Sequence, residues 1–375
     1  MNTNKKVIIV GLYYHPEMPS RVEMVYSYFR QTYDTIIITS DFVHPTKKYD
    51  ATEWKDCIKL HVPEYKTNFS IKRVLSHLNY ARQINKCLKE NKPNLIYICV
   101  PPNYSALRAA RWARKHKIPS IIDIVDIWPN TNAPSNKLLR IAYKVWSSIK
   151  DKAVLAADKV ILECSVYKND IPNVGSTMIP LSKRVDKKPN YEKHDDIRIV
   201  YIGAFSTSYD FESLVDIAKE IKEKGRGISI SLIGKGDEKN KVIRLLESAG
   251  IKTTDYGVIY DEEEKARILE TCDFGYNGFK PGMIVGQSYK SLDYMGYGLA
   301  LINSLQGDLR RIIESENCGL NFDATSRDKI AETIVGLSRE EIEEMKRSSF
   351  EAYTKHFSWE VYMESMNNVM KGFTI

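Results

Sequence analysis

Residues 198–236, RIVYIGAFSTSYDFESLVDIAKEIKEKGRGISISLIGKG, hold two short apolar runs on either side of a segment with helical period. The runs are RIVYIGAF (198–205) and ISISLIGKG (228–236), and the helix is expected over 211–224. Short runs rich in β-branched residues and closed by glycines are typical of strands that are buried on both faces. The stretch therefore predicts a β-α-β unit with two parallel strands and a right-handed crossover.

The same alternation continues on both sides of this unit. Downstream, strands are expected at TTDYGVI (253–259), DFGYNGF (273–279) and LALINS (299–304), with helices over 238–249, 261–271 and 289–296. Upstream, strands are expected at VIIVGLYY (7–14), TIIITS (35–40), NLIYICV (94–100), SIIDIV (120–125) and KVILEC (159–164), with helices over 71–90 and 104–117. Strands that alternate with helices predict an α/β protein with doubly wound sheets.

The polar segment SKRVDKKPNYEKHDDI (182–197) interrupts the pattern and predicts an interdomain linker. We therefore expect two Rossmann-like domains over 1–185 and 192–357, with a C-terminal helix at about 358–375 that packs back on the first domain. Because ligands bind at the carboxyl ends of strands in open α/β sheets, we expect the site in a cleft between the two domains.

Composition is that of a globular protein, since 43% of the 375 residues are hydrophobic and 27% are charged. No apolar run reaches the roughly 18 residues of a membrane span, and the segment before residue 7 does not resemble a signal peptide. Six cysteines lack the CxxC spacing of a zinc site or a redox pair. These features favour a reducing, cytoplasmic location.

Charge is distributed unevenly along the chain. Residues 1–189 hold 31 Lys and Arg against 16 Asp and Glu, whereas residues 190–375 hold 24 against 32. A basic half indicates an anionic partner such as acidic lipid, nucleic acid or a pyrophosphate-linked substrate, and the plainer alternative is a solvated basic surface. We expect no nucleic-acid partner, because no recognisable module is present.

A basic amphipathic helix is expected at KLLRIAYKVWSSIKDK (137–152). Its apolar stripe comprises Leu138, Leu139, Ala142, Val145, Trp146 and Ile149, with Ile141 at the edge. Such a helix suits an anionic bilayer, although the stripe could equally be ordinary core. The segment 71–89 adds Lys72, Arg73, Arg82, Lys86 and Lys89 to the basic face.

Three loops after predicted strands suit a nucleoside diphosphate. The small, hydroxyl-rich loop 203–208 opens a helix, and Gly234 and Gly236 flank Lys235 at a strand end. In KPGMIVGQSYKSLDYMGYGLALINS (280–304), a glycine-containing loop leads into a helix near Ser288 that carries Lys290 and Asp293 on one face. The alternatives are plain turns and a surface ion pair between Lys290 and Asp293.

The chain resembles retaining glycosyltransferases of the GT-B fold in family four. Their Pro-Ser-Lys-x-x-Glu-Tyr-x-x-x-Gly pattern stands here as Gln-Ser-Tyr-Lys-Ser-Leu-Asp-Tyr-Met-Gly-Tyr-Gly. Further similar segments are YYHPEMPSR (13–21), DIVDIWPN (123–130), GDLRRIIESENCGLNF (307–322) and HFSWEVYMESMNNVM (356–370). The Asp-x-Trp-Pro segment resembles that of bacterial polysaccharide enzymes, so the resemblance implies a role in capsule or lipopolysaccharide synthesis.

The resemblance implies that the chain moves a sugar from a nucleotide-sugar to a glycan or polyprenyl-pyrophosphate-linked acceptor, with retention and without metal or cofactor. The implied catalytic residues are Asp126 and Glu17, and His15 and Arg21 are implied to bind acceptor or phosphate. The implied donor-binding residues are Gly203, Ser206, Lys235, Gln287, Ser288, Lys290 and Asp293. The protein would then lie on the inner face of the cell membrane as a peripheral enzyme.

Two features depart from the family pattern. Val285 stands where the family has the first of two glutamates, and the stretch GAFSTSYD lacks the basic residues that clamp pyrophosphate. They motivate the alternative of a catalytically silent GT-B partner of another transferase. A further alternative is another GT-B enzyme, a nucleotide-sugar epimerase.

Overall fold

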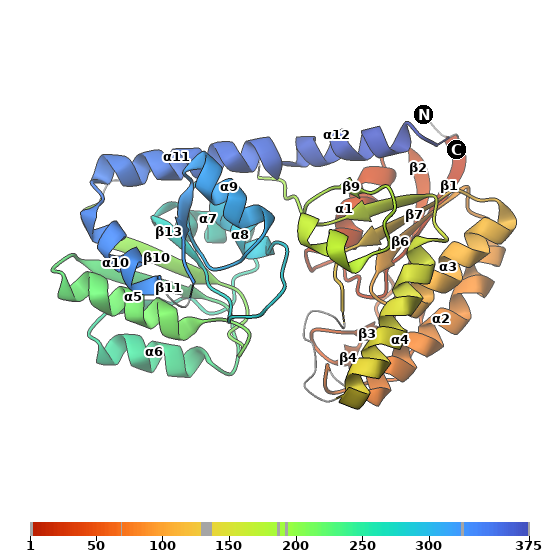
Figure 1. Ribbon diagram of the computed structural model, residues 1–375, viewed down its shortest axis with the longest axis horizontal. Coiled ribbons are helices and arrows are strands. Elements are labelled where there is room, and N and C mark those ends of the chain that lie inside the picture. The colour runs from red at the N-terminus through yellow and green to blue at the C-terminus, as the bar shows by residue number, and fades with distance from the viewer. Residues whose placement is uncertain are drawn as a thin grey trace. The chain divides into compact units, whose positions relative to one another are not determined.

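The computed structural model describes residues 3–68, 70–128, 137–185, 188–191, 194–323 and 326–373. The chain divides into two compact units, one comprising Met1–Pro180 with Met363–Ile375 and the other Leu181–Tyr362. Each is an α/β unit built on a parallel sheet (Figure 1). The predicted fold class is thereby confirmed, while the predicted cleft between the domains stays a prediction.

The first unit contains a seven-stranded sheet in the order β5-β2-β1-β6-β7-β8-β9, with every neighbouring pair parallel. Its strands are β1 (Thr3–Val10), β2 (Tyr33–Ser40), β5 (Cys57–Leu60), β6 (Leu95–Val100), β7 (Ser120–Ile124), β8 (Lys159–Leu162) and β9 (Thr177–Met178). Its helices are α1 (Arg21–Phe29), α2 (Ile71–Asn91), α3 (Asn103–His116), α4 (Lys137–Val154) and the 3-10 helix η1 (Ser165–Asp170). A small antiparallel pair is formed by β3 (Phe42–Val43) and β4 (Lys48–Tyr49).

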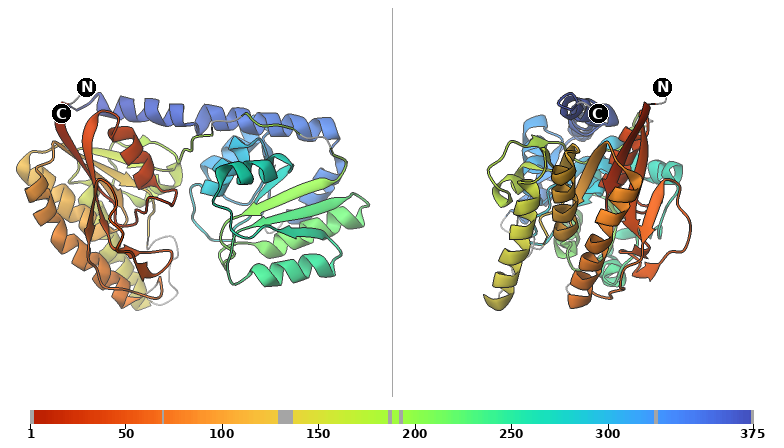
Figure 2. Two further views of the ribbon diagram at one scale, coloured as in Figure 1. Left: turned by 180° about the vertical axis from the view of Figure 1, so that it is seen from behind. Right: turned by 90° about the vertical axis from the view of Figure 1, so that its right-hand side faces the viewer.

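Helices α2, α3 and α4 lie side by side in one layer of this unit (Figures 1 and 2). The central strands β6 and β7 are buried at every position, as their continuous apolar runs predict. Helix α12 (Trp359–Met370) begins in the second unit, and its residues from Met363 onward belong to the first. The Tyr28 hydroxyl donates to the Asn367 side-chain oxygen over 2.7 Å and ties this segment to α1.

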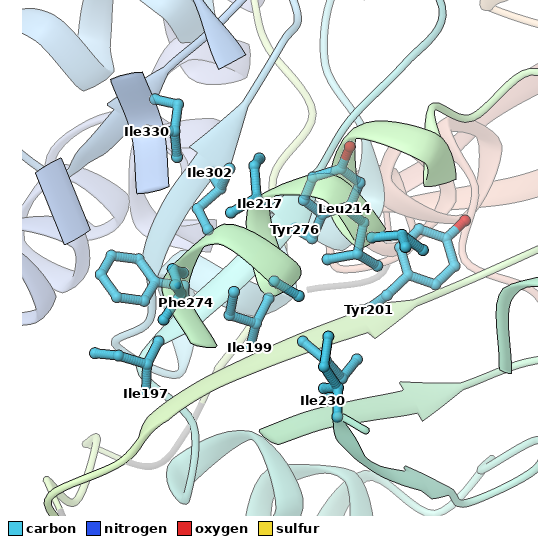
Figure 3. Packing of buried hydrophobic residues seen from close by; sticks show 14 of the residues in the cluster. Ile197, Ile199, Tyr201, Leu214, Ile217, Ile230, Phe274, Tyr276, Ile302 and Ile330 are labelled. Atoms are coloured by element: carbon cyan, nitrogen blue, oxygen red, sulfur yellow. The ribbon is translucent and has the colours of Figure 1, made fainter. Parts of the chain in front are cut away.

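The second unit contains a six-stranded parallel sheet in the order β12-β11-β10-β13-β14-β15. Its strands are β10 (Ile197–Ile202), β11 (Ile228–Ile233), β12 (Lys252–Asp255), β13 (Phe274–Asn277), β14 (Ala300–Asn303) and β15 (Gly319–Asn321). Its helices are α5 (Phe211–Glu223), α6 (Lys239–Ser248), α7 (Glu262–Glu270), α8 (Tyr289–Gly296), α9 (Asp308–Glu316), α10 (Arg327–Gly336) and α11 (Arg339–His356). Figure 3 shows its core, where side chains of β10, β13 and α5 pack together.

The predicted linker packs against the second unit where it is described. A Cβ at Gly296 would lie 2.7 Å from the Val185 side chain, and one at Gly298 would lie 2.7 Å from Pro189. Small residues in and after α8 thus leave room for this segment. The few apolar side chains in a polar sequence are enough to hold it on the unit.

The strand order indicates at which edge of each sheet a ligand is expected to bind. In the second sheet the order reverses between β10 and β13, and in the first between β1 and β6. Ligands of doubly wound sheets bind at the carboxyl ends of strands beside such a reversal. The loops 203–210 and 278–288 follow β10 and β13, and the loop 11–20 follows β1.

Within the described ranges, no helix has the length and apolar character that crossing a bilayer requires.

Candidate functional site

The loops after β10 and β11 pack backbone against backbone. Gly234 has φ +133° and Gly236 has φ +151°, and a Cβ on them would lie 1.9 Å from the Gly203 carbonyl and 2.2 Å from the Phe205 carbonyl. The Phe205 N–H donates to the Lys235 carbonyl over 2.9 Å. The neighbouring loop therefore requires glycine at both positions, and the hypothesis that they let a base or a phosphate approach stays a prediction.

Three other predicted donor-site residues lie on the same two loops. Gly203 has φ +132°, and a Cβ there would lie 4.0 Å from the Lys290 Cε, an ordinary contact distance. Ser206 is half-buried, and its carbonyl accepts from the Tyr209 N–H. The Lys235 side chain is exposed. The structure thus brings Gly203 close to Lys290 and leaves Lys235 at the surface.

Lys290 is buried in an aromatic cage. Its Nζ lies 3.5 Å from the centre of the Tyr209 ring, 4.4 Å from that of Phe279 and 5.0 Å from that of Tyr201. The residue is 7% exposed, and Nζ has no hydrogen-bond partner in the described part of the chain. Burial lowers the pKa of this ammonium group well below its ordinary value. The predicted alternative of a surface ion pair is wrong, because the cation lies inside the cage.

Asp293 belongs to a separate ionic network. Its carboxylate contacts the Lys183 Nζ and lies 3.5 Å from the Lys265 Nζ, and both lysines also contact Glu262. Burial would lower the pKa of Lys183, but the carboxylates of Asp293 and Glu262 outweigh it and raise that pKa. Two lysines thus hold the Asp293 carboxylate, and its role as an acceptor for ribose hydroxyls stays a prediction.

A chain of side-chain hydrogen bonds follows the carboxyl ends of three strands. The Ser288 hydroxyl donates to the Asn277 Oδ1 over 2.9 Å, and the Asn277 Nδ2 donates to the Asn303 Oδ1 over 2.8 Å. The Asn303 Nδ2 in turn donates to the Asn321 Oδ1 over 2.8 Å. We call Ser288, Asn277, Asn303 and Asn321 the asparagine ladder. Sequence reasoning missed it, although the strands FGYN, ALIN and GLN all end in asparagine.

Ser288 has a structural role, and its predicted role in donor binding is untested. Its hydroxyl joins the ladder and also accepts the Ser291 N–H as the N-cap of α8. Gln287 differs: it is buried, and its Nε2 has no partner among the described residues. Gln287 and Lys290 thus place two unsatisfied donors at the start of α8, where the helix dipole also favours an anion.

Replacing Asn277 by Ala should lower the free energy of unfolding by about 1–3 kcal/mol, because it removes the two hydrogen bonds that the buried Asn277 side chain makes with Ser288 and Asn303. Urea denaturation of the purified protein measures this loss. Asn321→Ala, at the half-buried end of the ladder, is the matched control and should cost less. Equal losses for both variants would show that the ladder does not stabilise the edge of the sheet.

In the first unit, Arg21 is buried and fully engaged. Its Nε donates to the Asp123 Oδ2 over 2.7 Å, and its terminal nitrogens donate to the carbonyls of Pro180 and Ile179 over 2.9 Å. The guanidinium ties α1 to β7 and to the end of the first unit, and the role of Arg21 in binding acceptor or phosphate stays a prediction. Its partner Asp123 lies in β7, and the sequence analysis did not recognise this pair.

His15 and Glu17 lie together in the loop after β1. The Glu17 N–H donates to the His15 Nδ1 over 3.2 Å, while the His15 Nε2 lies 3.5 Å from the Asp50 carboxylate. The His15 ring also packs against Trp54, with 4.9 Å between the ring centres. His15 thus has structural partners, and the Glu17 side chain is exposed.

Asp126 lies beside a buried cluster that we call the Arg73 cluster: Tyr13, Arg73, His77 and Trp128. The Arg73 guanidinium lies 4.6 Å from the centre of the Trp128 ring and donates to the Tyr13 hydroxyl, which lies 2.6 Å from the His77 Nε2. Burial raises the pKa of Asp126, against the N–H groups of Trp128 and Ile127 and the charge of Arg73. Arg73 was noted only as a surface cation, and its tertiary partners were not apparent from the sequence.

Chemically, the edge of the second sheet offers a buried cation, an amide donor and a helix N-terminus to an anionic ligand. The edge of the first sheet offers a carboxylate whose pKa is raised and which faces an arginine. Within the ranges described, no group of three or more His, Cys, Asp and Glu side chains is arranged to hold a metal ion.

Comparison with known proteins identifies the second unit. Residues 196–340 match the family model of Glycosyl transferases group 1. No curated protein matches the sequence. This match covers β10 through α10 and includes every donor-site residue predicted in the second half.

Solved structures resemble the chain over nearly its whole length. A sucrose-phosphate synthase from Thermosynechococcus elongatus superposes with a TM-score of 0.74 at 14% identity, covering 98% of this chain and 99% of that one. Anabaena HepE in complex with UDP and glucose gives 0.71 at 9%, covering 99% and 100%. The lipopolysaccharide outer core galactosyltransferase WaaB gives 0.69 at 14%, covering 98% and 99%. At such identities the likeness shows the fold alone: the chain has the GT-B fold, and its residues 196–340 match the family model of the group 1 glycosyl transferases.

Proposed function

We propose that the protein transfers a sugar from a nucleoside-diphosphate sugar to a hydroxyl of a glycan or polyprenyl-linked acceptor, with retention of configuration and without a metal ion. The observation that carries the proposal is the pair of buried, unsatisfied donors of Gln287 and Lys290 at the start of α8. They lie beside the strand reversal of the sheet, within the segment that matches the family. A diphosphate would satisfy both donors.

The proposed transfer reaction requires stabilisation of the charge that develops on the leaving group. Departure of a nucleoside diphosphate leaves a negative charge, and a preorganised cation in a site that excludes water stabilises such charge strongly. Lys290 is shielded from water by three rings, so its charge would be only weakly screened. In the first unit, the Asp126 carboxylate would orient the acceptor hydroxyl.

The setting we propose is bacterial surface polysaccharide synthesis, capsule or lipopolysaccharide, on the inner face of the membrane. The support is a cluster of exposed aliphatic side chains near the starts of α2 and α4: Ile71, Leu75, Ile141 and Val145, each more than half exposed. In α4 the predicted stripe splits, because Ile141, Ala142 and Val145 are exposed while Trp146 and Ile149 are half-buried. The side chains of Leu138 and Leu139 lie outside the described residues. Exposed aliphatics beside lysines suit a bilayer surface.

Thermal unfolding with a panel of UDP-, GDP- and dTDP-sugars tests the donor assignment. A ligand that binds only the folded state stabilises it by about 2.7 kcal/mol at a hundred times its Kd. We expect one nucleotide class to raise the unfolding temperature, and UDP-sugars come first because HepE was crystallised with UDP. If no nucleotide-sugar shifts the transition, the proposed function fails.

The specific alternative is a silent partner of another transferase. It is favoured by Val285 and by the loop GAFSTSYD, which has no basic residue. NMR of the product mixture separates the cases. Sugar appearing on an added acceptor supports transfer, and interconversion of the donor without acceptor supports an epimerase. Binding of a donor without turnover over any acceptor tried supports the silent partner.

A further inference from the structure

The Arg73 cluster holds a cation inside the first unit whose hydrogen-bond partners are uncharged. Arg73 is 7% exposed, and its terminal nitrogens donate to the Asn68 carbonyl and to the Tyr13 hydroxyl, each over 3.0 Å. Its Nε is buried and has no hydrogen-bond partner within the described ranges. Burying a cation without an opposite charge in contact is costly. Such a residue therefore indicates a place where a ligand supplies the missing charge.

Two indole groups add further unsatisfied donors. The Trp128 ring centre lies 5.8 Å from that of His77 and 6.1 Å from that of Trp146, which comes from α4. The Nε1 atoms of both tryptophans and the Nδ1 of His77 are buried without a partner among the described residues. Buried polar groups normally have hydrogen-bond partners, so several unsatisfied nitrogens in one cluster indicate a ligand that brings acceptor atoms.

The titratable groups of the cluster leave the charge of Arg73 largely uncompensated. Burial and the charge of Arg73 lower the pKa of His77 well below its ordinary value, and burial raises the pKa of Tyr13, so both are neutral at neutral pH. The Asp126 carboxylate is attracted to Arg73, but burial outweighs this attraction and raises the pKa of Asp126. The cluster thus presents donors with a positive charge, which suit an anion.

The position of the cluster is that of a ligand site. Tyr13 lies in the loop after β1 and Trp128 in the loop after β7, beside the reversal of strand order between β1 and β6. Helix α3 follows β6, and its N-cap Pro102 makes no side-chain capping hydrogen bond. The Asn103 Nδ2 donates to the Trp146 carbonyl over 3.0 Å, so the first turn of α3 adjoins this tryptophan. The positive end of the helix dipole thereby adds to the attraction for an anion.

We propose that the Arg73 cluster binds an anionic group, a phosphate or a carboxylate, of the sugar acceptor. The inference rests on the proposed function and narrows its acceptor to molecules that carry a negative charge close to the reacting hydroxyl. Both groups accept charge-assisted hydrogen bonds from a guanidinium and further hydrogen bonds from indole N–H groups. Because the charges of Asp126 and Arg73 act on each other, an acceptor hydroxyl oriented by Asp126 would place a neighbouring anionic group near Arg73.

Thermal unfolding of the full chain with three soluble sugars at matched ionic strength tests the proposal. The probes are glucose 1-phosphate, glucuronate and the neutral methyl glucoside, and a probe that binds only the folded state stabilises it by mass action. The cluster variants are Arg73→Met and Trp128→Phe. The matched control is Arg111→Met, which removes the same charge from an exposed position of the same unit. We expect an anionic sugar to stabilise the wild type and the control, and the probe that does so identifies the group as phosphate or carboxylate.

Arg73→Met should bind that anionic sugar at least about tenfold more weakly, because it removes a charge-assisted hydrogen bond. Trp128→Phe keeps an aromatic ring beside the guanidinium and loses one N–H group, so its affinity should fall severalfold. This second variant decides the question if Arg73→Met does not fold. A wild type that no anionic sugar stabilises, an equal response to methyl glucoside, or cluster variants that respond like the control would each overturn the proposal.

Stabilisation by nucleotide-sugar, measured on the same samples, separates this inference from the proposed function. A protein that responds to nucleotide-sugar but to no anionic sugar contradicts the inference alone, and the reverse result contradicts the transferase proposal. Lys290→Met should keep its response to the anionic sugar. If Lys290→Met loses that response and Arg73→Met keeps it, the anion binds in the second unit and the inference is wrong.

Discussion

Replacing Lys290 by Met should abolish the stabilisation by nucleotide-sugar and lower the transfer rate about 10²–10³-fold, the usual effect of removing one preorganised charge-stabilising group. Methionine keeps the length of the lysine stem and packs well against aromatic rings, so the cage of Tyr201, Tyr209 and Phe279 should stay filled. Removing a buried, unpaired ammonium should leave the unliganded protein at least as stable as the wild type. Thermal unfolding with and without donor measures both effects on the same sample.

Lys235→Met is the control for this prediction. Lys235 lies on the neighbouring loop and is also a predicted donor-site cation, but its side chain is exposed and screened by water. We expect its loss to weaken donor binding only slightly. If Lys290→Met keeps the full response to donor, the cation in the cage is a packing feature, and the diphosphate site must be sought elsewhere on the unit.

The fold was predictable because its signals are local. Continuous apolar runs such as LIYICV and VIIV mark strands buried on both faces, and the helical period between them sets the crossovers. The polar segment at 182–197 was predicted as a free linker, since nothing local shows that Val185 and Pro189 pack beside small residues of the α8 region. Such contacts join positions about a hundred residues apart.

The site was less predictable for the same reason. A glycine at a strand end indicates a close approach, but only the structure shows that Gly234 faces the Gly203 carbonyl. A serine at the start of a helix indicates a cap or a phosphate contact. In the structure, the Ser288 hydroxyl caps α8 and belongs to the asparagine ladder. Arg21 and Asp293 were predicted to be available charges, yet each has an ionic partner far away in the sequence. Lys290 has no ionic partner among the residues that the structure describes, which is why it stays the leading candidate.

Replacing Asp126 by Asn should lower the transfer rate by about 10²–10⁴-fold, the usual contribution of a positioned acid or base, while it raises thermal stability at neutral pH. The side-chain oxygen of Asn can still accept the Trp128 N–H, which bonds to the Asp126 Oδ1 over 3.1 Å. The gain in stability follows from the raised pKa, because a carboxylate that burial makes harder to ionise costs folding free energy once it is ionised.

The sign of the pH dependence makes this prediction specific. Since the pKa of Asp126 is raised in the folded state, its ionisation destabilises the fold at pH values above the ordinary pKa of aspartate. The difference in unfolding temperature between Asn and Asp should therefore be largest near neutral pH and vanish at low pH, where both folded and unfolded chains are protonated. Unfolding curves across this pH range, with transfer rates at each pH, provide the measurement. Asp158→Asn is the contrast, because the Asp158 carboxylate accepts from the Ser120 N–H and hydroxyl, so we expect its replacement to lower the stability. A variant at Asp126 that loses stability at neutral pH would mean that Arg73 holds the carboxylate as a structural ion pair, and the catalytic assignment would then lose its physical basis.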